Sequence, residues 1–193
     1  MSTSGRIISV RCGTGFDLVL DNGVEVEVYI LPKSLGSRSS LACGWRLRLG
    51  SREATCRGEL ECPEQVWELL LDVIGRVVRE LRHDDNRFEA VLDSGEKLVV
   101  ETLDKDCMVC YALPRYVRVE APSCSLAEEY AYTLSKRIID TTIVYTDDKC
   151  YLGVLEQHLE SLARLCRSGE IEEDICSLFA SVIDQIPAPE RAT

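Results

Sequence analysis

The sequence of 193 residues predicts an α+β fold: a mostly antiparallel sheet, with helices on one face and an αα-hairpin at the C-terminal end. Two kinds of pattern predict this class. Short runs that alternate apolar and polar residues are typical of strands with one buried face, and turn residues separate these runs. Longer stretches carry apolar residues three and four positions apart, which is typical of amphipathic helices. Several strands precede each helical stretch, and this order predicts helices packed on a sheet.

The first half of the chain predicts strands. Residues 16–20 and 24–30 flank an Asp-Asn-Gly turn, and Asn-Gly between alternating runs is the strongest local signal for a hairpin. A shorter strand covers residues 6–12. After a loop rich in small polar residues, we expect a second hairpin over 41–49 and 53–61.

A long helix is expected over residues 63–83. Pro63 fits the first turn of a helix, and Glu64 would lie near the positive end of the helix dipole. Apolar residues at helical spacing form a broad face: Val66, Leu69, Leu70, Val73, Ile74, Val77, Val78 and Leu81. A face this broad is typical of a helix packed on a core. The predicted first unit is therefore 1–83, a β-rich segment that ends in this helix.

The predicted second unit, 84–148, repeats the plan of the first. Residues 88–95 match 16–23, with Phe, Val, Leu, Asp and Gly in register. The further expected elements are strands over 107–113 and 116–120, a helix over 125–139, and a strand over 142–145. The repeat has two explanations: duplication of a strands-then-helix unit, or two hairpins made alike by turn chemistry. The sequence leaves both open.

Residues 149–187 predict a helical hairpin, and 188–193 a frayed tail. Each helix has a narrow apolar seam, as in a coiled coil. We expect this hairpin to mediate homo-oligomerisation by forming a four-helix arrangement from two copies. The alternative is docking on the chain's own sheet. The residues expected at the contact are Tyr151, Leu152, Leu155, Leu159, Leu162, Ile175, Leu178, Phe179 and Val182.

The bulk composition restricts location and partners. No run of about 18 apolar residues occurs, so no membrane span is expected. The residues before the first strand have no apolar segment of signal-peptide length, so the sequence predicts a cytoplasmic protein. The net charge of −11 argues against a general nucleic-acid binder, because such proteins neutralise phosphates with excess Lys and Arg. Another protein chain is the expected partner.

The cysteines and amides predict a hot habitat. Only two Asn and three Gln occur, and thermolabile amides are depleted in proteins of hyperthermophiles. Ten cysteines are unusual in a cytoplasmic chain, except in hyperthermophiles, whose intracellular proteins are rich in disulfides. Structural disulfides and buried thiols are both compatible with this pattern. The pairing cannot be read from the sequence.

The strongest polar candidate is a strip of arginine and aromatic residues: Trp45, Arg46, Arg48, Arg115, Tyr116 and Arg118. Arginine beside aromatic rings suits phosphate contact and base stacking, so a shared sheet would carry a basic strip for nucleic acid or another polyanion. The alternative is a solvated face on which these arginines pair with Glu25, Glu27 and Glu59 of neighbouring strands.

No segment carries the motif of a known reaction, so we expect no catalytic residue, no metal and no cofactor. The Cys107–Cys110 pair has zinc spacing but lacks two further ligands nearby. Paired acids at 84–85, 104/106 and 147–148 are common turn and cap residues. The leading expectation is therefore a non-enzymatic interaction or assembly protein. A polyanion-binding module and a small enzyme with an unrecognised carboxylate site are the alternatives.

Overall fold

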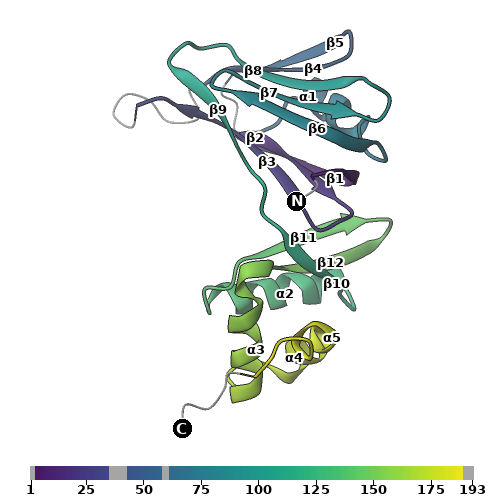
Figure 1. The fold of residues 1–193 in the computed structure, drawn as a ribbon, viewed down its shortest axis with the longest axis vertical. Coiled ribbons are helices and arrows are strands. Elements are labelled where there is room, and N and C mark those ends of the chain that lie inside the picture. Colours follow the sequence, from purple (N-terminus) through teal and green to yellow (C-terminus); the bar gives the residue numbers. More distant parts are fainter. Residues whose placement is uncertain (1–2, 35–42, 58–60, 189–193) are drawn as a thin grey trace. The chain divides into compact units, whose positions relative to one another are not determined.

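A computed structural model describes residues 3–34, 43–57 and 61–188, and the chain forms two compact units, Met1–Pro114 and Arg115–Thr193 (Figure 1). The α+β class is confirmed, because both sheets are antiparallel and each unit also contains helix. The boundaries differ from those predicted at 83 and 148. Residues 84–112 complete the sheet that the first half of the chain begins, so the first unit extends to Pro114.

The first unit contains nine strands and one helix within its described residues. They are β1 (Gly5–Cys12), β2 (Gly15–Leu20), β3 (Glu25–Pro32), β4 (Trp45–Leu49), β5 (Arg52–Cys56), α1 (Glu64–Leu71), β6 (Val77–Asp84), β7 (Arg87–Leu92), β8 (Lys97–Thr102) and β9 (Cys107–Ala112). The predicted strand starts at 41–42 and part of the predicted strand end, 58–60, lie outside the described residues.

The nine strands form one sheet with the order β5-β4-β8-β7-β6-β1-β2-β3-β9. Strands β1 and β6 pair at the middle of this order, and each carries a register shift beside that pairing. The fourth strand of each half pairs with the third strand of the other half: β4 pairs with β8, and β9 pairs with β3. Strands β1–β4 and β6–β9 therefore occupy matching places in the sheet.

The two predicted hairpin turns are also built alike. The amide of Leu20 donates to the carbonyl of Val24, and that of Leu92 donates to Glu96, each at 2.9 Å. Gly23 and Gly95 supply the positive φ angles of the turns, 88° and 81°. Similar turn chemistry accounts for these bonds, so an ancestral duplication stays a prediction.

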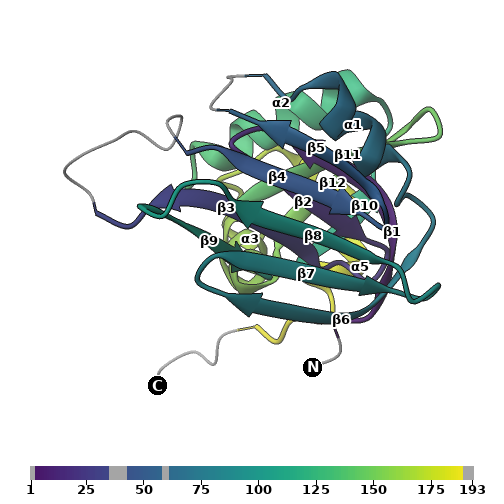
Figure 2. The same cartoon turned by 90° about the horizontal axis from the view of Figure 1, so that it is seen from above.

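The sheet curls so that strands far apart in its order come together (Figures 1 and 2). The disulfide Cys43–Cys107 joins the residue two positions before β4 to the first residue of β9, with 6.0 Å between the Cα atoms. The amide of Val109 donates to the carbonyl of Asp85 at 3.0 Å. Inside the curl, the aromatic rings of Phe16, Trp45 and Phe88 pack together. Strands β7, β8 and β9 thus enclose one core with β1 to β4.

The long helix predicted over 63–83 is wrong beyond its first half. Helix α1 spans Glu64–Leu71, and Gly75, with a φ angle of 87°, lies in the turn that follows it. One residue of the predicted apolar face, Ile74, is 42% exposed. From Val77 onward the chain is strand β6, because its β-branched start pairs with β1 and β7.

The second unit is a three-stranded sheet with helices. Its elements are β10 (Tyr116–Glu120), α2 (Cys124–Ser135), β11 (Thr141–Thr146), β12 (Lys149–Leu155), the 3₁₀ turn η2 (Glu156–His158), α3 (Leu159–Ser168), α4 (Glu173–Leu178) and α5 (Ala180–Ile183). The strand order is β10-β12-β11. The sequence leaves open whether the two halves share one sheet. Strands β6 to β9 do join the first sheet, whereas β10 to β12 form a sheet of their own with a separate core.

The predicted helical hairpin begins too early. Residues 149–155 form β12, which pairs with β11 through a turn at Asp147-Asp148. The spacing of Leu152 and Leu155 fits a helix, but Cys150, Leu152 and Val154 also alternate as in a strand, and strand pairing decides. The helical part starts after β12. The predicted frayed tail lies almost entirely outside the described residues.

The helices after β12 dock on their own unit. Among the nine predicted association residues, Leu152, Leu162, Ile175 and Phe179 are completely buried in this core. Leu159 and Leu178 are half-buried and pack against it, and Tyr151, Leu155 and Val182 are also half-buried. These contacts match the alternative in which the helices dock on their own chain. Homo-oligomerisation through this hairpin stays a prediction, but little of the apolar seam is exposed for a second copy.

Eight of the ten cysteines form disulfides: Cys12–Cys62, Cys43–Cys107, Cys124–Cys150 and Cys166–Cys176. The cytoplasmic prediction is wrong on this finding. Four disulfides point to an oxidising, extracellular or secreted environment, because reducing systems in the cytoplasm keep thiols free. The prediction depended on the residues before β1 alone. No helix in the described part of the chain is long and apolar enough to cross a membrane.

Alkylation without a reducing agent tests the disulfides. When the native protein is denatured and alkylated without a reducing agent, we expect only Cys56 and Cys110 to be labelled. Loss of the Cys43–Cys107 bridge in a double alanine variant should lower the free energy of unfolding by about 2–4 kcal/mol, because the unfolded chain gains freedom. Mass spectrometry and urea unfolding measure the two effects. Ten alkylated thiols in the native protein would contradict this assignment.

Candidate functional site

The structure separates the residues of the predicted arginine-aromatic strip. Trp45, Arg46 and Arg48 lie on β4 of the nine-stranded sheet, whereas Tyr116 and Arg118 lie on β10 of the second sheet. Trp45 is only 1% exposed because its ring packs against Phe16 in the core. It therefore cannot stack on a ligand. The two arginines of β4 face outward and remain as candidates.

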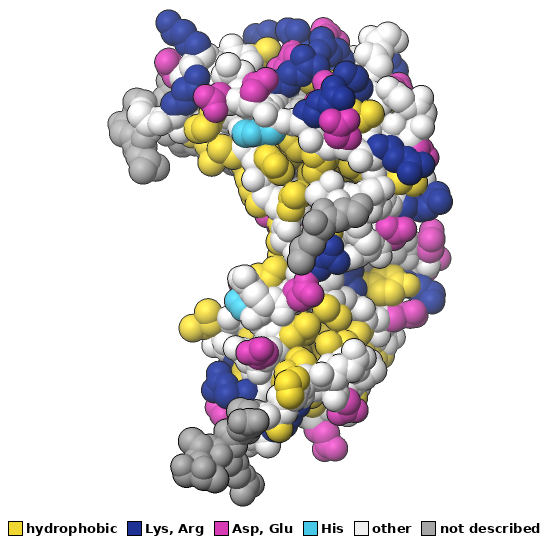
Figure 3. Space-filling model, viewed as in Figure 1, with side chains coloured by type: hydrophobic (Ala, Val, Ile, Leu, Met, Phe, Trp, Pro, Cys, Tyr) yellow, Lys and Arg dark blue, Asp and Glu magenta, His cyan; other side chains and the backbone are white. Residues whose placement is uncertain are grey.

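Arg46 and Arg48 belong to a larger charged surface that the sequence analysis missed. We define the arginine–glutamate face as the outward, ion-paired side chains of β4 to β8: Arg46, Arg48, Glu53, Glu80, Arg82, Arg87, Glu89, Lys97 and Glu101. Figure 3 shows Lys and Arg side chains gathered with acidic ones over this part of the first unit.

The pairs on this face run from strand to strand. A guanidinium nitrogen of Arg48 lies 3.2 Å from Glu101, and Arg87 lies 3.6 Å from the same carboxylate. Arg46 lies 4.0 Å from Glu53. Pairing with acids of neighbouring strands is the predicted alternative to a free basic strip. The partners are not Glu25 and Glu27, because those residues lie on β3, and Glu59 lies outside the described residues.

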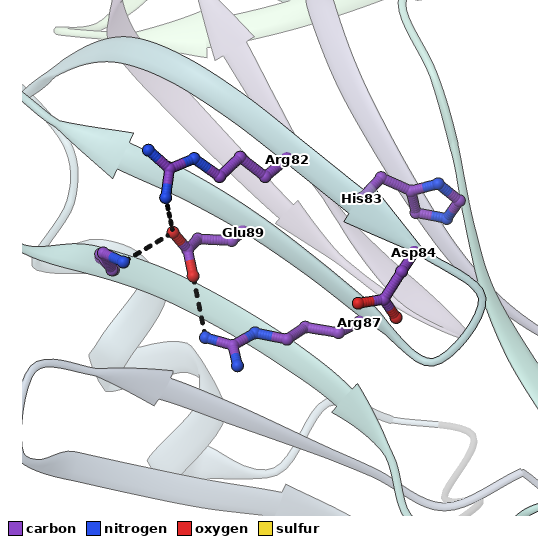
Figure 4. A pocket seen from close by; sticks show the side chains of 6 residues that line it. Arg82, His83, Asp84, Arg87 and Glu89 are labelled. Carbon is purple, nitrogen blue, oxygen red and sulfur yellow. Dashed lines mark hydrogen bonds and ion pairs between the residues drawn. The ribbon is translucent and has the colours of Figure 1, made fainter.

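Glu89 is the centre of the face. It is 5% exposed, yet three cations surround it: Arg87 at 2.8 Å, Lys97 at 2.9 Å and Arg82 at 3.5 Å (Figure 4). The hydrogen bond from Lys97 lowers the pKa of the Glu89 carboxyl more than burial raises it. Glu89 is therefore ionised at neutral pH and holds the three cations together.

An open cavity of about 370 Å³ lies over this centre, lined by Arg82, His83, Asp84, Arg87, Glu89 and Lys97. Figure 4 shows that the His83 ring points away from Glu89. Its Nε2 lies 2.6 Å from the carbonyl oxygen of Val109, and Asp84 accepts a hydrogen bond from the amide of Asn86. These two residues thus support the backbone, while the cations and Glu89 face the cavity.

A second polar group lies on β1 to β3. Arg11 bridges Asp17, at 3.2 Å, and the fully buried Glu25, and the Tyr29 hydroxyl donates to Glu27. Burial raises the pKa of Asp17 from 3.8 to about 6, in spite of the opposing charge of Arg11. A carboxyl with this pKa can accept or release a proton near neutral pH.

The cavity beside Asp17 has a volume of about 210 Å³, and the Gly13-Thr14-Gly15 turn lines it. The amide of Gly13 donates to the carbonyl of Gly15 at 2.9 Å, so this segment is a tight turn. Gly15 is required because a Cβ there would collide with the backbone of Val28. Such a turn offers no row of amides to a phosphate.

The paired acids noted in the sequence have local backbone roles. Asp104 accepts a hydrogen bond from the amide of Gly44 at 2.9 Å. Asp147 and Asp148 form the β11–β12 turn with φ angles of 48° and 61°. Across the described ranges, no three His, Cys, Asp or Glu side chains are grouped as metal ligands.

The cations of β6 to β8 were missed for two reasons. Arg82 was placed at the end of a helix, because the Arg-Glu-Leu-Arg-His-Asp segment after Val78 has no strand-like alternation, whereas the structure places it on strand β6. Arg87 and Lys97 were treated only as parts of a repeat. Their nearness to β4 depends on the β4–β8 pairing, which no local pattern reveals.

Comparisons with protein-family models, curated proteins and solved structures give no match to this chain.

The raised pKa of Asp17 predicts a pH-dependent effect of the variant Asp17→Asn. Because the folded-state pKa exceeds the unfolded value, stability is full below pH 3.8 and is lost as the pH rises to about 6. At pH 7.5 the uncharged asparagine should raise the free energy of unfolding by about 1 kcal/mol, a modest gain because water partly screens the carboxylate.

Urea unfolding at pH 7.5 and at pH 4 measures this effect. The difference between Asp17→Asn and the wild type should shrink at the lower pH, where both side chains are uncharged. A difference of the same size at both values, or destabilisation at pH 7.5, would contradict the assignment.

Proposed function

We propose that this is a non-enzymatic binding protein whose first unit binds a polyanion on the arginine–glutamate face. The observation that supports this proposal best is that Arg82, Arg87 and Lys97 all form ion pairs with one carboxylate, Glu89, beneath an open cavity. The whole face carries five cations and four carboxylates, so it has a small local excess of positive charge in a chain of net charge −11.

The cations keep donors for a ligand although they are ion-paired. The side chains of Arg82, Arg87 and Lys97 are 55%, 40% and 46% exposed. A guanidinium has five N–H donors, and the two carboxylates that pair with each of Arg82 and Arg87 use only some of them. The pairs with Glu89 also restrict these long side chains, which lowers the entropy that binding must remove.

The extent of the face favours a polymer over a small anion. Its charges occupy β4, β8, β7 and β6, which are consecutive in the sheet. Neighbouring strands lie about 4.8 Å apart, so the cations are spread over roughly 14 Å. Repeated phosphate or sulfate groups can contact cations at that spacing. Polymers of phosphate groups, such as nucleic acid, and polymers of sulfate groups share this chemistry, so both are candidate ligands.

Neutral variants of two cations test the face. Arg82→Gln/Lys97→Gln should weaken binding about tenfold and reduce the dependence of log affinity on log salt by about 1–2, because fewer counterions are released. Fluorescence anisotropy with labelled single-stranded DNA and with labelled heparin, each over a salt series, measures both quantities and separates the two sources.

The matched control for that test is Lys136→Gln/Arg164→Gln, which makes the same change of charge in the second unit. Its affinity should stay near that of the wild type. Equal losses in the two variants would assign binding to net charge alone. If the wild type binds neither polymer at low salt, the proposed function is wrong.

Removal of the central carboxylate should have the opposite effect on binding. Glu89→Gln removes the acid that competes with a ligand for three cations, so the affinity for the polyanion should rise several-fold. The same change leaves the cations repelling one another, and the free energy of unfolding should fall by about 1 kcal/mol. Glu120→Gln, which removes the partner of Lys149 in the second unit, is the control. Weaker binding by Glu89→Gln would contradict this role.

A further inference from the structure

Strand β11 (Thr141–Thr146) is an edge strand without the usual protection. The second sheet has the order β10-β12-β11, so within the described residues β11 pairs with a strand on one side only. Its sequence, Thr-Thr-Ile-Val-Tyr-Thr, holds no charge and no proline, and its pairing with β12 has no bulge. Proteins normally place charges, prolines or bulges on edge strands to prevent pairing with other chains. An edge that lacks all of them suits a partner strand.

The other sheet edges are protected. Strand β5 is short and begins with the exposed charges Arg52 and Glu53. Strand β9 is uncharged, but Val109 is bonded to Asp85 where the first sheet curls. Strand β10 carries Arg118 and Glu120. In a chain with 28% charged residues, β11 is the edge that combines open pairing with neutrality.

The β11–β12 turn fixes which backbone groups of β11 point outward. The turn has two residues with positive φ angles, Asp147 and Asp148, between the paired Thr146 and Lys149. In a two-residue hairpin the closing pair is hydrogen-bonded, and bonding alternates along the strand. The even-numbered residues of β11 therefore bond to β12, as the bond from Leu155 to the Asp140 carbonyl confirms. The N–H and C=O groups of Thr141, Ile143 and Tyr145 point away from β12.

We propose that β11 pairs in antiparallel fashion with β11 of a second copy, with Ile143 on the two-fold axis. Pairs that exchange hydrogen bonds across the new ladder must come from the outward residues. Centring on Ile143 places Thr141 opposite Tyr145 of the other copy. In this register Asp140 faces Thr146, so no two acids are directly opposed.

A second copy fits this edge for electrostatic and symmetry reasons. Two chains of net charge −11 repel, and the neutral β11 is where their backbones approach without opposed like charges. A two-fold contact between identical strands is closed, which is the commonest assembly of soluble chains. The resulting six-stranded sheet has β10 at both edges, where Arg118 and Glu120 oppose further pairing.

Charge variants at the Thr141–Tyr145 pair test both the contact and its register. Thr141→Lys/Tyr145→Lys sets lysine opposite lysine twice and should convert a dimer into a monomer. Thr141→Glu/Tyr145→Lys sets glutamate opposite lysine and should keep the dimer. Light scattering after size exclusion, from micromolar concentration to the solubility limit, measures the mass against 21.6 kDa per chain. A wild-type monomer throughout, or a double-lysine dimer, overturns the proposal.

Hydrogen exchange on the wild-type protein gives a test that needs no variant. The amides of Thr141, Ile143 and Tyr145 should become protected as concentration rises through the dimerisation range, whereas those of the even-numbered residues of β11 should be protected throughout. Concentration-independent exposure of the odd-numbered amides rules out pairing. Concentration-independent protection of them shows that the chain itself covers the edge, which also overturns the proposal.

Discussion

The disulfide between Cys43 and Cys107 is the constraint on which the first unit depends. It joins the chain just before β4 to the start of β9, although seven places separate these strands in the sheet order. With these ends held together, the curled sheet encloses a core, which contains the rings of Phe16, Trp45 and Phe88. The same closure turns the opposite side of β4 to β8 outward, so the charged face follows from it. A flat sheet with these side chains would leave three aromatic rings in water.

Turn chemistry and alternation were enough to predict the hairpins, because both signals are local. Asn22-Gly23 and Ser94-Gly95 mark two turns, and the flanking runs alternate. The helix after Pro63 shows where such reasoning ends. Val77 and Val78 continue its apolar spacing, but Gly75 follows the helix and pairing with β1 and β7 recruits them to a strand. Long-range pairing thus overrides a periodic pattern, as it does again for Leu152 in β12.

The candidate face was less predictable than the fold. Alternation on β4 correctly sets Arg46 and Arg48 on the side opposite Trp45, and that half of the face was visible in the sequence. The other half comes from Arg82, Arg87 and Lys97, which meet Glu89 only through the order of β6, β7 and β8. Disulfide pairing was equally hidden, because Cys43 and Cys107 are 64 residues apart. Location was misjudged for the same reason: the oxidised pairs exist only in the folded chain.

The exchange of β4 and β9 between the two halves also governs how the first unit can be made. Strand β3 has no neighbour on one side until β9 has been synthesised, and β4 waits for β8. A nascent chain that ends before β8 therefore holds two strands whose backbone groups have no partner strand on one side. Contacts between segments so distant in sequence form slowly. Exposed strands of this kind associate with other chains. The first half of the chain is therefore exposed to such association until the second half completes the sheet.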